Sequence, residues 1–354
     1  MNKRKLALVR EFMSINSVDT LLLQRSNNFA WLTDGAASYI GIASDIGPSS
    51  ILITKDFHYV LTNNIEALHL KQEQGLSDWD FLVSSWIDGQ VSNIKKLSVG
   101  VIGSDYFFPE ARDISSLFAP LRYDLDELEL KRYRELGLAT GRALQKAARE
   151  ILPGMSENEI AGLVAKYCYA EQIIPIVNLV ATDERIFKYR HPLPTEKKLD
   201  KHATLVVGGR KWGLVASATR SVYFGSLPDQ LRKNSEACAR IDAAYISATK
   251  EGVTLRDVFW AGAKAYEKEG HAESWQIHHQ GGLAGYTSRE ILAKPNEQYR
   301  LKKSQAFAWN PILPGVKSED TILLTSNGIE VITQVDKWPF IDCNGLTRPD
   351  ILVL

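Results

Sequence analysis

The chain has 354 residues, of which 45% are hydrophobic and 24% charged, a composition typical of a globular protein with room for two domains. Its 42 basic residues equal its 42 acidic residues in number, so the formal net charge is zero. No overall electric field therefore favours a nucleic acid or an anionic membrane, and we expect neither as a partner.

The cysteines and the first residues bear on the cellular compartment. Cys168, Cys238 and Cys343 are far apart and form neither a CxxC zinc pattern nor a disulfide framework, so we expect a reducing, cytoplasmic location. The basic start is followed by Arg10 and Glu11, which interrupt the apolar run of a signal peptide and favour an amphipathic first helix. No stretch approaches the roughly 20 apolar residues of a membrane span.

The first third of the chain alternates short apolar runs with helical stretches, which predicts a small α/β domain over residues 1–122. Residues 50–54 and 59–62 indicate a β-hairpin. The other elements that we expect here are a strand at 18–23, a strand at 97–102, and helical stretches at 64–74 and 109–118.

A second domain is expected over residues 123–354. The charged run 124–135 opens a long helix that ends before Pro153, and Ser156 with Glu159 forms a capping box for a helix over 157–171. The elements expected after it are strands at 174–181 and 203–208, a hairpin to 224, helices at 229–250 and 255–269, and a strand-rich end.

Five short motifs occur in a recognisable order. They are Gly154–Ile160, His191–Thr195, Thr219-Arg220, His279–Gly282 and Glu319–Thr321. Together they resemble the pita-bread superfamily of Xaa-Pro aminopeptidases, prolidases, methionine aminopeptidases and creatinase, and the resemblance covers essentially the whole chain.

That resemblance implies an α/β (α+β) fold. Residues 28–33 and 61–64 are similar to the amino-terminal domain of the Xaa-Pro and creatinase branches. Residues 1–122 would therefore form a creatinase/prolidase-like α/β domain and residues 123–354 a pita-bread catalytic-type domain.

The resemblance also implies a metal centre, in which two Asp, one His and two Glu hold two divalent cations that activate a water. His279 and Glu319 match the pattern, but Asn310 stands in place of the first Glu. The places of the two Asp fall at Val206–Gly208 and at Ser217, and residues 201–228 contain no Asp or Glu. One His and one Glu supply too few ligands for such cations, so we expect no dinuclear Mn, Co or Zn site and no other cofactor.

The resemblance points to His279, His191 and Glu319 as catalytic candidates. His279 could instead be a hydrogen-bonded core histidine, and His191 a loop histidine held between prolines, whereas His278 is expected to be structural. Glu319 could be an acid or base, or could accept hydrogen bonds from Arg220. A carboxylate beside an arginine stays ionised, which favours an electrostatic role.

Five residues are substrate-binding candidates: Arg220, Asn310, Ser217, Arg289 and Glu290. Arg289-Glu290 falls near the place of the family's second His-Glu dipeptide but several residues later in the chain. The pair could contact a substrate or could be an ordinary surface ion pair.

Three functions remain open. The chain could be a metal-dependent Xaa-Pro peptidase, or a metal-free hydrolase of a small amide or amidino compound on the creatinase plan. It could also be a non-catalytic module that binds peptides or proteins. The resemblance implies a small-molecule or short-peptide ligand and a homodimer.

Overall fold

The computed structural model describes residues 2–354, which divide into two compact units. The first contains the residues through Tyr123 together with Trp212–Leu214, and the second contains Asp124–Lys211 and Val215–Leu354. Both units combine helices with β-sheets, which confirms the predicted α/β fold class. None of the helices in residues 2–354 has the length and apolar composition that a membrane span requires.

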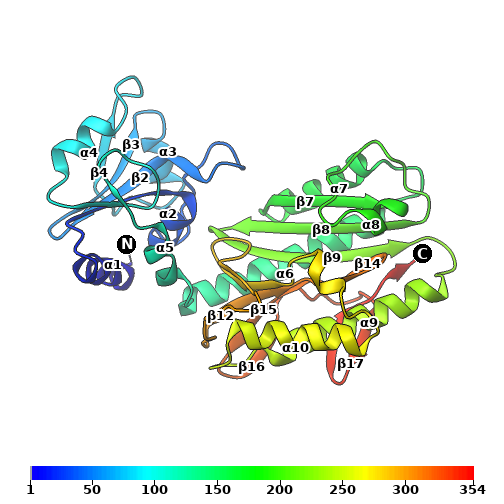
Figure 1. The fold of residues 1–354 in the computed structure, drawn as a ribbon. Coiled ribbons are helices and arrows are strands. Elements are labelled where there is room, and N and C mark those ends of the chain that lie inside the picture. The colour runs from blue at the N-terminus through cyan, green and yellow to red at the C-terminus, as the bar shows by residue number, and fades with distance from the viewer. Residues whose placement is uncertain (1) are drawn as a thin grey trace. The chain divides into compact units, whose positions relative to one another are not determined.

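The first unit is built on a six-stranded sheet with the order β4-β3-β2-β1-β5-β6 (Figure 1). Its strands are β1 (Thr20–Arg25), β2 (Ile46–Thr54), β3 (His58–Asn63), β4 (Phe81–Ser84), β5 (Ile102–Ser104) and β6 (Arg112–Asp113). Its helices are α1 (Lys3–Ile15), α2 (Ser26–Leu32), α3 (Ala67–Gln72), α4 (Val91–Leu97), α5 (Ser115–Phe118) and the 3-10 helix η1 (Ala119–Arg122).

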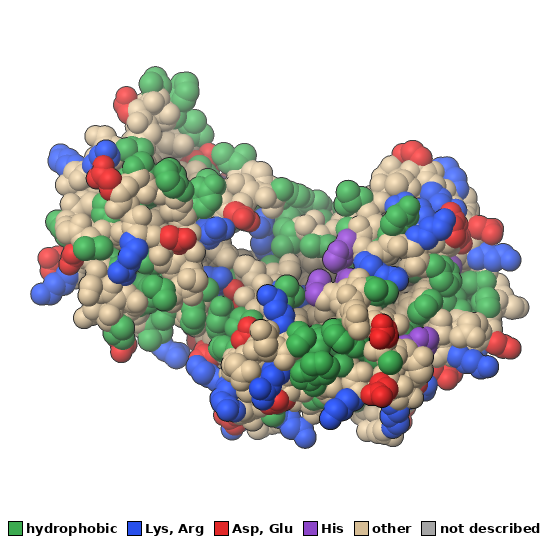
Figure 2. Space-filling model, in the orientation of Figure 1, with side chains coloured by type: hydrophobic (Ala, Val, Ile, Leu, Met, Phe, Trp, Pro, Cys, Tyr) green, Lys and Arg blue, Asp and Glu red, His purple; other side chains and the backbone are tan. Residues whose placement is uncertain are grey.

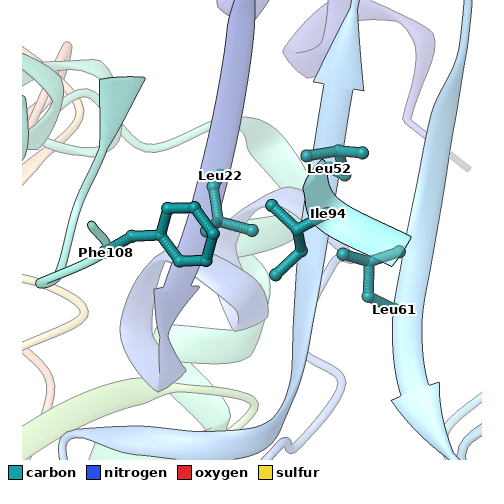
Figure 3. Packing of buried hydrophobic residues seen from close by; sticks show 5 residues of the cluster. All are labelled: Leu22, Leu52, Leu61, Ile94 and Phe108. Carbon is teal, nitrogen blue, oxygen red and sulfur yellow. The ribbon is translucent and has the colours of Figure 1, made fainter. Parts of the chain in front are cut away.

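Apolar side chains from neighbouring strands and one helix form a core in this unit (Figure 3). Leu22, Leu52 and Leu61 come from β1, β2 and β3, and Ile94 of α4 and Phe108 pack with them. Ile94 is the buried residue of α4, so this side chain anchors the helix to the sheet. Burying each such side chain stabilises the fold by roughly 1.5–3 kcal/mol.

The predicted β-hairpin is confirmed, because β2 and β3 pair antiparallel with Ser50 opposite Leu61. The predicted strand at 97–102 is wrong: α4 ends at Leu97 and β5 begins at Ile102. Gly100 between them has φ +55°, and the Val101 N–H donates to the Asp19 carboxylate at 2.7 Å, so these residues form a turn. The helical stretch predicted at 109–118 shortens to α5.

The second unit contains a four-stranded sheet, a five-stranded sheet and two short strand pairs (Figure 1). The first has the order β19-β9-β8-β7, with β7 (Ile174–Thr182), β8 (His202–Lys211), β9 (Leu214–Tyr223) and β19 (Leu352–Val353). The second has the order β11-β10-β12-β15-β16, with β10 (Gly281–Ala284), β11 (Ile291–Leu292), β12 (Gln305–Trp309), β15 (Asp320–Thr325) and β16 (Gly328–Val331). Two short pairs are β13 (Ile312–Leu313) with β14 (Val316–Lys317), and β17 (Phe340–Cys343) with β18 (Leu346–Pro349).

Helices cover these sheets. They are α6 (Glu127–Glu150), α7 (Glu157–Ala170), α8 (Glu184–Lys188), α9 (Asp229–Ala248), α10 (Leu255–Lys268) and the 3-10 helix η2 (Ser274–Ile277). The predicted capping box of Ser156 and Glu159 is present at the start of α7, where each residue accepts the other's backbone N–H. Helices α6 and α7 pack together and against β8, while α9 packs against α10 and the β13–β14 pair. The strands and helices predicted between 174 and 269 are confirmed to within a few residues.

Candidate functional site

Three of the predicted residues meet at one end of the sheet that contains β10, β12 and β15. His279 precedes β10, Asn310 follows β12, and Glu319 precedes β15. Trp309 of β12 lies opposite both Gly281 and Asp320, and the Asn310 N–H donates to the Gln280 carbonyl at 3.1 Å. Strand pairing therefore brings together three positions that are well separated along the chain.

Gly281 is required for this close pairing. It has φ +107°, a conformation that L side chains rarely adopt, and a Cβ on it would lie 2.1 Å from the Ala308 carbonyl oxygen. The glycine that follows His279 by two residues thus lets β10 approach β12. This gives a physical reason for the glycine in the motif.

The other sheet supplies Ser217 from the middle of β9. The Ser217 N–H donates to the Thr321 hydroxyl at 2.8 Å, and that hydroxyl donates to the Ser217 carbonyl at 2.9 Å. The Thr219 N–H donates to the Glu319 carbonyl at 3.0 Å. These bonds tie β9 to the start of β15 and place Ser217 near Glu319.

A cavity of about 120 Å³ lies at this junction. Its polar and charged lining residues are His191, Ser217, His279, Ser288, Arg289, Asn310, Lys317 and Glu319. Its apolar wall is formed by Val177, Leu179, Val206, Val207 and Gly208. Six of the eight predicted site residues therefore line one pocket, and the segment 206–208 predicted to replace a metal ligand is part of its wall.

Two side-chain cations hold the Glu319 carboxylate. Arg289 donates to Oε1 at 3.0 Å, and Lys317 lies 2.9 Å from Oε2, which also accepts the Thr219 hydroxyl at 2.8 Å. The side chains of Lys317, Glu319 and Arg289 are 6%, 4% and 10% exposed. Both carboxylate oxygens are thus paired, and the three charged side chains are almost fully buried.

The environment of Glu319 sets its protonation state. Burial by itself raises the pKa of this carboxyl group, but Lys317 and Arg289 outweigh burial and hold the pKa at about 2. Glu319 is therefore ionised at neutral pH and does not exchange protons there. Of the roles left open by the sequence, this environment supports the electrostatic one.

Three imidazoles lie together beside this ion cluster, and Figure 2 shows histidine side chains gathered on one face of the larger unit. The rings of His278 and His279 stack with centroids 4.5 Å apart, and His191 Nε2 lies 3.2 Å from His278 Nε2. His278 is buried and contacts the exposed His191, which lines the pocket.

All three imidazoles are hard to protonate. Burial, followed by the positive field of Lys317, lowers the pKa of His278 to about 3. Burial, followed by the charges of Arg289 and Lys317, lowers the pKa of His279 to about 4. Burial also lowers the pKa of His191. At neutral pH the imidazoles are therefore uncharged.

Several polar atoms of the pocket have no hydrogen-bond partner among residues 2–354. They are Asn310 Oδ1, His279 Nδ1 and Arg289 Nε. Asn310 is only 2% exposed, so its amide oxygen is an acceptor shielded from bulk water. Because buried polar groups are normally paired, these atoms are the ones that a ligand would satisfy.

Arg220 does not line this pocket, and it does not form the hydrogen bond to Glu319 that the sequence left open as one alternative. Its guanidinium donates to Asp320 at 2.9 Å and to the carbonyls of Thr219 and Thr333. Arg220 is 1% exposed and is absent from the pocket lining. Side chains alternate along 317–320, so Asp320 faces away from the side that Glu319 faces.

The predicted Arg289-Glu290 pair separates in the structure. Arg289 lines the pocket, where it pairs with Glu319 and lies 3.4 Å from the Ser217 hydroxyl. Glu290 accepts the Tyr286 N–H at 3.0 Å and does not line the pocket. The structure thus places only Arg289 where it could contact a ligand.

Besides Ser288, Lys317 is a polar pocket residue that the sequence did not predict. It lies two residues before Glu319, and side chains two apart in an extended segment face the same way. That spacing was a usable signal once Glu319 had been identified as a site residue.

The donor set bears on whether a metal could bind. Glu319 has both oxygens paired, Asn310 is neutral, and the wall at 206–208 offers no side-chain ligand. The nitrogens of His191, His278 and His279 lie within 4.8 Å of one another, a spacing that one metal ion could use. The fields of Lys317 and Arg289, which disfavour protonated His279, would also oppose such an ion.

Comparison with known proteins shows which family this chain resembles. Residues 131–326 match the model of metallopeptidase family M24. The chain is 22% identical to an Xaa-Pro dipeptidase of Pyrococcus horikoshii, over 94% of this chain and 97% of that protein.

Solved structures agree over nearly the whole chain. The prolidase from Pyrococcus horikoshii has a TM-score of 0.81 at 19% identity, over 94% of this chain and 99% of that one. The Xaa-Pro dipeptidase from Bacillus anthracis has a TM-score of 0.80 at 20% identity, over 99% of both chains. These likenesses confirm the predicted pita-bread architecture.

Proposed function

Because the chain belongs to metallopeptidase family M24, we propose that it is a prolidase-like hydrolase homologue whose pocket works without a dinuclear metal centre. Its substrate would be a small amide or amidino compound, as in creatinase. The observation that carries this proposal is the engagement of both Glu319 oxygens by the side-chain cations Lys317 and Arg289.

Electrostatics supports a metal-free pocket. At an effective dielectric constant of about 20, two unit charges about 4 Å apart interact by about 4 kcal/mol. A divalent cation at the same distance would meet about twice this repulsion from each of the two fixed cations and would have to displace them from the Glu319 carboxylate. The residues present therefore do not fit the two-ion centre of the family.

The proposed chemistry uses the remaining groups. Neutral His279 accepts a proton from an attacking water, and the exposed His191 exchanges protons with solvent and the leaving group. Glu319 stays ionised and keeps the two cations in place. Ser217 and Asn310 orient the substrate through hydrogen bonds.

The first test is elemental analysis of protein purified without chelator, followed by titration with Mn²⁺, Co²⁺ and Zn²⁺ under thermal-stability readout. We expect neither near-stoichiometric metal nor a stability gain. Hydrolysis of glycyl-proline and of a guanidino acid, with and without chelator, should then be insensitive to chelator and absent in His279→Ala. Stoichiometric metal with chelator-sensitive cleavage would restore the metal-dependent Xaa-Pro peptidase.

A non-catalytic module that binds a peptide or protein is the second candidate. Such a module needs no proton transfer, and the observation behind it is that Glu319 is ionised and that His279, with a pKa of about 4, is a weak base. Saturable binding of a peptide without any product, measured by calorimetry and chromatography, would select this alternative.

The assembly and location implied by the resemblance are also proposals. We propose a cytoplasmic homodimer, and sedimentation velocity at several concentrations would distinguish it from a monomer. Cell fractionation with an antibody would test the compartment.

A further inference from the structure

Lys317 and Arg289 have more hydrogen-bonding capacity than their partners use. The Lys317 ammonium carries three N–H donors, and its ion pair within residues 2–354 is with Glu319. Arg289 Nε is buried without a partner. Both side chains are at least nine-tenths buried and line the cavity, so bulk water cannot readily satisfy these donors.

The charges of the pocket do not balance. Its lining contains two permanent side-chain cations, Arg289 and Lys317, and a single carboxylate, Glu319. The remaining lining residues are apolar, hydroxyl, amide or imidazole side chains and add no negative charge. The cavity is therefore short of one negative charge.

We propose that Lys317 replaces a metal cation as the counter-ion of Glu319, so that with Arg289 it selects a carboxylate-bearing ligand and excludes divalent cations. This inference rests on the proposed metal-free pocket and specifies that the ligand of this pocket is negatively charged. The ligand carboxylate accepts from Lys317 and Arg289, and a neighbouring N–H of the ligand donates to Asn310 Oδ1. One small molecule then satisfies both the spare donors and the orphaned acceptor.

The Lys317 side chain is far more buried than most lysine side chains that form ion pairs in this chain. Most lysine side chains that form ion pairs here are well exposed, as in the Lys302–Asp124 pair, where Lys302 is 61% exposed. Lys317 instead is held within the pocket, 2.9 Å from Glu319. Removing a buried lysine charge changes the field in the pocket, whereas removing the charge of Lys302 does not.

The test is NMR of histidine-labelled full-length protein, with acetate as the carboxylate probe and acetamide as its neutral match. In the wild type, acetate should shift the ring signals of His279 and His191 saturably, and acetamide should not. Mn²⁺ should not broaden the same signals selectively. Assignments come from His279→Ala and His191→Ala.

Three variants complete the design. Lys317→Met should weaken acetate binding at least tenfold and allow selective broadening by Mn²⁺, whereas Lys317→Arg should behave as the wild type. Lys302→Met is the control and should change neither the affinity for acetate nor the response of the histidine signals to Mn²⁺. If Lys317→Met does not fold, the Lys317→Arg variant and the wild-type titrations still decide the question.

The outcomes separate this inference from the proposed function. Wild-type protein that binds Mn²⁺ at these histidines, or that fails to discriminate acetate from acetamide, overturns the role of Lys317. Unchanged acetate binding in folded Lys317→Met also overturns it. Chelator-insensitive hydrolysis could still hold in that case, because hydrolysis is measured independently.

Discussion

Two charged networks lie on opposite faces of the short segment 317–320. On the inner face, Asp320 pairs with Arg220 and Arg348, and Asp242 pairs with Arg348, all with side chains at most 1% exposed. On the pocket face, Glu319 alone pairs with two cations. The inner network balances two arginines with two aspartates, whereas the pocket network carries an excess cation.

This difference in net charge distinguishes a network that stabilises the fold from a network that can bind a charged ligand. A buried network with equal charges holds β15, α9 and β18 together and leaves no net charge for a ligand. A network with an unmatched cation retains an attraction for an anion. Neighbouring residues can serve the two purposes because successive side chains of an extended segment face opposite ways.

The largest effect is expected from breaking the inner network. Asp320→Asn leaves Arg220 and Arg348 buried beside a neutral group, and breaking a buried ion pair in this way costs about 3–5 kcal/mol. The measurement is urea-induced unfolding followed by circular dichroism. Glu330→Gln, which removes an exposed partner of Arg134, is the control and should cost about 0–1 kcal/mol. A loss for Asp320→Asn as small as that of the control would contradict the comparison.

A smaller loss is expected on the pocket face. Glu319→Gln leaves Lys317 and Arg289 without their carboxylate, but the adjoining cavity lets water or an anion compensate, so we expect about 1–3 kcal/mol. Added acetate should recover part of this loss in thermal unfolding. Because the wild-type pocket is itself expected to bind acetate, the wild type is the control, and an equal gain in both proteins would mean that acetate does not replace the missing Glu319 carboxylate.

The contribution of Glu319 should depend on pH with a definite sign. Its folded-state pKa of about 2 lies below the ordinary value of 4.5, so its stabilisation is complete above about pH 4.5 and is lost as the pH falls toward 2. The stability difference between the wild type and Glu319→Gln should shrink across this window in acid titrations of urea unfolding. A constant difference would mean that Glu319 is not held ionised by its two cations.

The smallest effect is expected from the imidazoles. The folded-state pKa of His279 is about 4, below the ordinary 6.5, so the neutral ring favours the fold above pH 6.5 and this contribution fades as the pH falls toward 4. His279→Gln should therefore flatten the pH dependence of stability between these values. His271→Gln, at a position outside the pocket, is the control for the substitution itself.

The elements that the sequence predicted best are those with strong local signals. The capping box of Ser156 and the long amphipathic helices α6, α9 and α10 depend on residues near one another in the chain, and all are found. The strand predicted at 97–102 failed because Val99 and Val101 suit a strand, while Gly100 between them and the distant Asp19 form a turn. A tertiary contact of this kind leaves no local pattern.

The site was predictable to the extent that motifs marked it. His191, Ser217, His279, Arg289, Asn310 and Glu319 were all identified and all line one cavity. Lys317 was missed because no motif includes it, and Arg220 was misplaced because the Thr219-Arg220 motif does not show which face each side chain takes. The second error concerns the direction of a side chain relative to a neighbouring strand.

The sequence by itself determined the order of the elements, the family motifs and the absence of carboxylates between 201 and 228. Those features follow from which residues are present and how far apart they stand. Only the tertiary structure decided that Lys317 and Arg289 neutralise Glu319 while Arg220 serves Asp320. The physical reason is strand register: a shift of one residue reverses every side chain, so partners across strands are set only when the sheet is assembled.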